Sequence, residues 1–123
     1  MKKIAIVGSR NFVDYPYFKS IIDEYLLKDD LSVEFVSGGA KGSDALAEQY
    51  ANEHNIPIHI HYPDWKSLGK IAGRIRNQSI IDDSDELIAF WDGFSTGTKM
   101  TISFAKAKGI PYKVVYINEY LIF

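Results

Sequence analysis

The sequence predicts an α/β fold, a Rossmann-like three-layer sandwich whose parallel sheet of about five strands has helices on both faces. Short apolar runs rich in β-branched residues alternate with segments of ten or more residues that have helical periodicity. Three of the apolar runs lead directly into a turn built from glycine and a hydroxyl residue. We expect right-handed crossovers, the strand order 3-2-1-4-5 and one domain over residues 1–123.

The first half of the chain begins with a strand at Ile4–Val7, an apolar run expected to be buried on both faces and ended by Gly8. Apolar residues then recur at three- and four-residue spacing, which predicts an amphipathic helix from Tyr15 or Pro16 to Lys28. Proline suits the first turn of a helix. The second strand is predicted at Val33–Val36.

The second helix is predicted at Ser43–His54. We expect Ser43 to be its N-cap and Asp44 to face the positive end of the helix dipole. A third strand follows at Pro57–Ile60, after a left-handed-tolerant Asn and a strand-opening proline.

The second half continues the alternation. Helices are predicted at Gly69–Asp82 and Thr98–Lys108, and strands at Glu86–Trp91 and Tyr112–Ile117. The inward face of the first of these helices is predicted to comprise Leu68, Ile71, Ala72, Ile75 and Ser79.

The composition narrows the class of protein. The chain has no cysteine, which excludes disulfides and thiolate chemistry, and its three histidines lack zinc-site spacing, so no metal is expected. The net charge of −2 is not that of a protein that coats nucleic acid, and a nucleic-acid partner is not expected. The chain enters its first strand directly after Met1-Lys2-Lys3, so we expect a cytoplasmic protein without a membrane partner.

The three glycine turns are the best indication of function. They are Gly8–Arg10, Ser37–Ser43 and Asp92–Thr98, and they follow the first, second and fourth strands. Glycine lets backbone N–H groups approach an anion, and a following helix N-terminus adds donors and partial positive charge. In the predicted strand order the three turns surround the crevice between strands one and four, where such sheets bind ligands. The alternative is that they are ordinary turns and helix caps.

Other candidates lie around the same crevice. On the 69–82 helix, Arg76 offers a planar fork for phosphate, whereas Lys70 and Arg74 are interpreted as a solvated basic face. Trp91 is a candidate for packing against a ring, and Asp92 could bind ribose hydroxyls, hold a water or cap its turn. The candidate catalytic residues are Arg76 and Asp92. The predicted ligand-binding residues are Gly8, Ser9, Arg10, Ser37, Gly38, Gly39, Lys41, Gly42, Ser43, Asp44, Arg76, Asn77, Trp91, Asp92, Gly93, Ser95, Gly97 and Thr98.

These residues resemble the SLOG superfamily, specifically its small single-domain YspA/YpsA-related group. The matching segments are Ile6–Arg10, Val36–Asp44, Ala72-Gly73 with Arg76-Asn77, and Ala89–Gly93 leading to Gly97-Thr98. The resemblance implies a Rossmann-like fold that binds nucleotides or nucleotide-derived ligands. It covers nearly the whole chain.

Two kinds of relative imply alternatives. The LOG enzymes, which cleave nucleoside monophosphates to base and phosphoribose, carry an arginine on the third helix and Gly-Gly-x-Gly-Thr-x-x-Glu. Here Arg76 and Gly97-Thr98 match, but Thr101 stands where the glutamate would be. Threonine cannot act there as an anion. The DNA-processing protein DprA implies single-stranded DNA binding, which the mild acidity of this chain does not favour.

We therefore expect a binding module for a nucleotide or nucleotide derivative, in signalling or nucleotide metabolism, without a cofactor. The first alternative is a LOG-like N-glycosidic hydrolase. The second is an oligomeric interaction module, because the terminal segment 116–123 is apolar and could form an edge strand, a core clasp or a homodimer contact.

Overall fold

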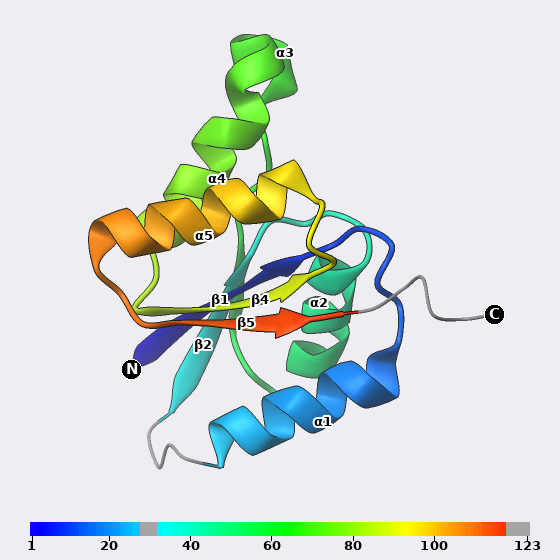
Figure 1. Ribbon diagram of the computed structural model, residues 1–123. Coiled ribbons are helices and arrows are strands. Elements are labelled where there is room, and N and C mark those ends of the chain that lie inside the picture. Colours follow the sequence, from blue (N-terminus) through cyan, green and yellow to red (C-terminus); the bar gives the residue numbers. More distant parts are fainter. Residues whose placement is uncertain (28–31, 118–123) are drawn as a thin grey trace, which may run out of the picture.

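The computed structural model describes residues 1–27 and 32–117, whose strands form one parallel sheet in the order β3-β2-β1-β4-β5 (Figure 1). The strands are β1 (Lys2–Gly8), β2 (Val33–Ser37), β3 (Ile58–Ile60), β4 (Glu86–Trp91) and β5 (Tyr112–Tyr116). The helices are α1 (Tyr15–Leu26), α2 (Ser43–Glu53), α3 (Trp65–Leu68), the 3₁₀ turn η1 (Gly69–Ile71), α4 (Ala72–Asp82) and α5 (Thr96–Lys108). The predicted fold class and strand order are confirmed.

Helices cover both faces of the sheet, with α1 and α2 on one side and α4 and α5 on the other (Figure 1). Alternate residues of the central strand β1 point to opposite faces: Ile4 and Ile6 join the core under α1 and α2, whereas Ala5 and Val7 join the core under α4 and α5. All four are buried, as the unbroken apolar run predicts for a strand covered on both faces.

The segment before β4 differs from its prediction. One helix was expected over 69–82, but the chain forms the short α3, then η1, and only then α4. Figure 1 shows α3 projecting beyond the sheet. Ile71 and Ile75, expected to face inward, are 55% and 40% exposed, whereas Ala72 is buried as expected and Ile80 and Ile81 are buried as well. The α4 helix joins the core of this face of the sheet through Ile80 and Ile81 in its last turn, and Ile75 lies outside that core.

Helix ends differ by a residue or two elsewhere. The α5 helix begins at Thr96 because Ser95 is its N-cap, and it ends with Gly109 in the left-handed conformation. The α1 helix ends at Leu26, and the expected end at Lys28 lies outside the described residues, as does most of the apolar terminal segment, 118–123. None of the described helices has the length and apolar character needed to cross a membrane.

Candidate functional site

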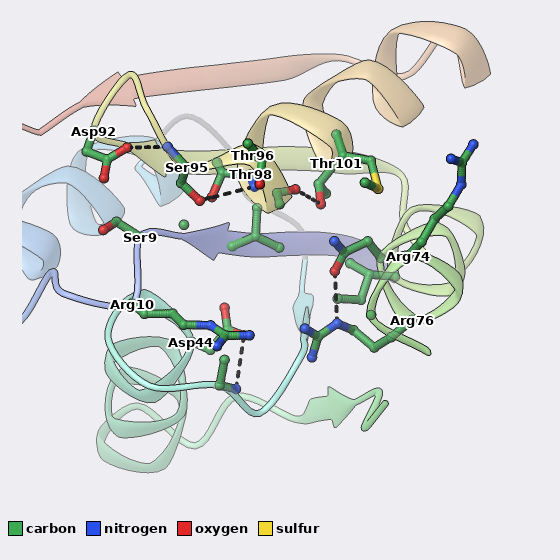
Figure 2. Close-up of a pocket in the computed structure, with 18 of the residues that line it drawn as sticks. Ser9, Arg10, Asp44, Arg74, Arg76, Asp92, Ser95, Thr96, Thr98 and Thr101 are labelled. Carbon is green, nitrogen blue, oxygen red and sulfur yellow. Dashed lines mark hydrogen bonds between the residues drawn. The ribbon is translucent and has the colours of Figure 1, made fainter. Parts of the chain in front are cut away.

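A crevice of about 600 Å³ opens beyond the carboxyl ends of β1 and β4 (Figure 2). The strand order reverses at this point, since β1 lies between β2 and β4. Ten of the predicted binding residues line the crevice: Gly8, Ser9, Arg10, Asp44, Arg76, Asn77, Asp92, Ser95, Gly97 and Thr98. The structure therefore brings together parts of all three glycine turns.

The other predicted binding residues do not line it. They are Ser37, Gly38, Gly39, Lys41, Gly42, Ser43, Trp91 and Gly93. Trp91, predicted to pack against a ligand ring, instead donates from Nε1 to the Ser95 carbonyl oxygen at 3.0 Å. Its ring lies beside Tyr116, with 5.8 Å between the ring centroids. Trp91 thus packs toward β5.

The turn after β1 is bound to the N-terminus of α2. Ser43 donates to the carbonyl oxygen of Ser9 from its backbone nitrogen at 3.1 Å and from its hydroxyl at 3.0 Å. The prediction of Ser43 as the N-cap is wrong: Gly42 occupies that position and Ser43 is the first helical residue. These donors of α2 are directed at the protein's own backbone, and they fix the turn that carries Arg10.

The turn after β2 surrounds a carboxylate of the protein itself. The buried Asp44 accepts a hydrogen bond at Oδ2 from the Ala40 backbone nitrogen at 3.1 Å. Burial raises the pKa of Asp44, partly offset by that N–H, the positive charge of Arg76, the Ser37 hydroxyl and the Gly38 N–H. Donors that the sequence assigned to a ligand phosphate are therefore used by Asp44.

The turn after β4 keeps donors directed at the crevice. Asp92 Oδ1 accepts from the backbone nitrogens of Phe94 and Ser95, both at 2.8 Å, and so caps its own turn. Ser95 Oγ accepts from the Thr98 N–H at 3.4 Å. Within residues 1–27 and 32–117, no acceptor is found for the N–H groups of Thr96 and Gly97, which open α5.

Asp92 is held in its charged form. Burial acts to raise the pKa of Asp92, but hydrogen bonds from the Ser95 and Phe94 N–H groups and from the Ser9 hydroxyl outweigh burial and lower that pKa below its ordinary value. The carboxylate thus holds the turn that leads into the N-terminus of α5.

Two arginines face these donors from the other side of the crevice. Arg76 donates from Nη1 to the Gly38 carbonyl and from Nε to Asn77 Oδ1 at 2.9 Å. Burial lowers the pKa of Arg76, the Asp44 carboxylate raises it, and the nearby positive charge of Arg10 lowers it. Arg10 and Arg76 point toward one another beside Asp44 (Figure 2). Adjacent cations of this kind favour an anion between them.

Several lining residues were absent from the predicted set. They are Val7, Asn11, Ala40, Gly73, Arg74, Phe94, Thr96, Ile80, Met100 and Thr101. Arg74, predicted to be solvated, is exposed; it extends away from the other arginines (Figure 2), and its guanidinium lies 5.9 Å from the centroid of the Phe104 ring. Thr101 is buried and donates from Oγ1 to the Gly97 carbonyl at 3.0 Å. Phe94 and Thr96 lie within the third glycine turn, and that position in the sequence could have identified them as lining residues.

No group of three or more acidic or histidine side chains within the described ranges could hold a metal ion. The arrangement therefore offers backbone donors, arginines and hydroxyls, which are the groups that bind phosphates.

Comparisons with known proteins agree with the fold. A family model described as the YspA, cpYpsA-related SLOG family (YAcAr) matches residues 2–67. The Gene 61 protein of Mycobacterium phage D29 is 31% identical over 117 residues, which cover 90% of this chain and 94% of that protein. The X-ray structure of TM1055, a structural genomics target, has a TM-score of 0.67 at 23% identity, over 91% of this chain and 72% of that one. At that identity it shows the fold alone. This chain belongs to the YspA, cpYpsA-related SLOG family.

Proposed function

We propose that the chain binds a nucleotide or a nucleotide-derived phosphorylated ligand in the crevice between β1 and β4. The observation that carries the proposal is the pairing of N–H groups at the start of α5, on Thr96 and Gly97, with Arg10 and Arg76 across the crevice. A phosphate at the helix N-terminus would accept from those N–H groups and be neutralised by the arginines.

The size and charge of the crevice support the same ligand class. Its volume of about 600 Å³ falls within the usual range for small-molecule sites. Three arginines line it against two aspartates, Asp44 and Asp92, and both carboxylates accept backbone N–H groups. The surplus positive charge would attract an anionic ligand. A cytoplasmic role in nucleotide signalling or nucleotide metabolism would follow.

A LOG-like hydrolase is the second candidate, because Asp92 and Asp44 line the crevice together with Arg76. We favour binding because Thr101 stands at the position of the LOG glutamate, and its hydroxyl donates a hydrogen bond to the Gly97 carbonyl oxygen. Incubation with nucleoside monophosphates separates the two, since only a hydrolase releases free base. Molecular-mass measurement in solution separately tests the homodimer alternative.

The test of binding is calorimetric titration with a panel of nucleoside mono- and diphosphates. We expect Arg10→Ala to weaken binding about tenfold, because it removes a charge-assisted hydrogen bond. The matched control is Lys41→Ala, which removes an exposed cation from the β2 turn, outside the crevice lining. Absence of binding by the wild type, or an equal loss in both variants, would contradict the proposal.

A further inference from the structure

The crevice has one exposed aromatic side chain. Phe94 lines it with 74% of its surface exposed, and it is the only aromatic residue among the described residues of the lining. The other lining side chains are polar, charged or small, apart from the aliphatic Val7, Ile80 and Met100. A ring exposed within the lining of a ligand crevice is placed where it can pack against a planar ligand.

The position of Phe94 is fixed by its backbone. Its N–H donates to Asp92 Oδ1 at 2.8 Å, and the N–H of Ser95 donates to the same oxygen at 2.8 Å. The α5 helix begins at Thr96, two residues after Phe94. The ring is therefore carried by a constrained turn directly before the helix N-terminus proposed for the phosphate.

Two other planar groups nearby are held by hydrogen bonds. Trp91 hydrogen-bonds to the Ser95 carbonyl and lies beside Tyr116, outside the lining. Arg76 is tied to Gly38 and Asn77. Phe94 is the aromatic ring that the described lining exposes to the crevice.

We propose that Phe94 is the platform on which the base of the ligand stacks. This inference rests on the proposed function and extends it: the ligand retains a nucleobase, and a bare sugar phosphate or inorganic phosphate fills only part of the site. Aromatic rings stack on any nucleobase through their π faces, so Phe94 confers a preference for a base over no base without selecting among the bases.

The test compares a nucleoside monophosphate with ribose 5-phosphate by calorimetric titration. Phe94→Ala and Phe94→Leu should each weaken binding of the nucleotide by about tenfold, the usual scale for a base–aromatic stack, and leave ribose 5-phosphate within twofold. Phe94→Tyr should bind the nucleotide like the wild type. Because the side chain is exposed, all three variants should keep the wild-type melting temperature, which circular dichroism checks.

A spectroscopic measurement provides an independent readout. Phe94→Trp should add fluorescence, relative to the wild type with its two tryptophans, that the nucleotide quenches and ribose 5-phosphate does not. Absence of this difference would contradict stacking.

The outcomes separate the two proposals. If the wild type binds the nucleotide and Phe94→Ala binds it equally well, the stacking role is wrong and the crevice remains a nucleotide site. A Phe94→Leu variant that binds the nucleotide as tightly as the wild type overturns stacking as well. So do variants that lose the same affinity for the nucleotide and for ribose 5-phosphate. Tight binding of ribose 5-phosphate with no gain from a base has the same consequence. A wild type that binds neither ligand overturns the proposed function, and this inference with it.

Discussion

Replacing Gly42 with alanine tests why the β1 turn and α2 are joined as they are. Gly42 has φ 70° and ψ −124°, a combination that glycine alone adopts readily. A Cβ on this residue would overlap the carbonyl oxygens of Ser9 and Arg10. Those oxygens belong to backbone, so the β1 turn must move away from α2, and both hydrogen bonds from Ser43 to Ser9 are disturbed.

The expected loss follows from these contacts. Backbone strain costs about 1–3 kcal/mol. Two hydrogen bonds at about 1 kcal/mol each add about 2 kcal/mol, for a total of about 3–5 kcal/mol. For a chain of 123 residues this corresponds to a fall in melting temperature of roughly 10–20 °C.

Gly69 provides a matched control. Its backbone has nearly the same conformation, φ 58° and ψ −132°, but an added Cβ meets no atom within 4 Å. Gly69→Ala should therefore show the strain alone, and Gly42→Ala should be less stable than Gly69→Ala by about 2 kcal/mol. Urea denaturation of both variants measures the difference. Free energies of unfolding that agree within about 0.5 kcal/mol would refute the role assigned to the Ser9 contact.

The remaining predictions concern charge and capping. Burial raises the pKa of Asp44, so the stability that this group contributes at acid pH is lost as the pH rises above 3.8 through its folded-state pKa. The urea midpoint of the wild type should therefore fall over this pH range, and Asp44→Asn should make that fall smaller. Asp92 behaves oppositely: burial raises its pKa, but the N–H groups of Ser95 and Phe94 lower that pKa by more. The stability that Asp92 contributes is therefore lost as the pH falls below 3.8, and Asp92→Asn should remove this loss at acid pH. Lys108 Nζ donates to three carbonyls at the end of α4, at 2.9–3.0 Å, so Lys108→Met should cost about 1–2 kcal/mol in thermal unfolding; an unchanged melting temperature would contradict that capping role.

The fold could be predicted because its signals are local and repeated. The run Ile4–Val7 is apolar at every position, which requires cover on both faces, and each later strand is followed by a glycine turn or preceded by a proline. The segment 65–82 was predicted less well. Its apolar residues Ile71 and Ile75 have helical spacing, but periodicity cannot show that this part of the segment lies outside the core.

The position of the crevice could be predicted from the sequence, but the hydrogen-bond partners within it could not. Glycine and hydroxyl residues marked the turns, and nine predicted residues of those turns and of α4, together with Asp44 of α2, do line one crevice. The sequence does not reveal that Asp44 folds back on the Ala40 N–H, because that depends on the local path of the β2 turn. Nor does it reveal that Ser43 donates to Ser9, because that depends on how segments after two different strands meet. Trp91 was predicted to pack against a ligand ring, yet its Nε1 donates to the Ser95 carbonyl oxygen of the turn beside it.

Amide chemical shifts during titration with a nucleoside monophosphate test the central claim most directly. A phosphate at the start of α5 should move the N–H resonances of Thr96 and Gly97 most, because these groups have no acceptor among the described residues. The N–H of Ala40, already bonded to Asp44, should move less. Shifts confined to the β2 turn, or no shifts in the crevice, would contradict the account.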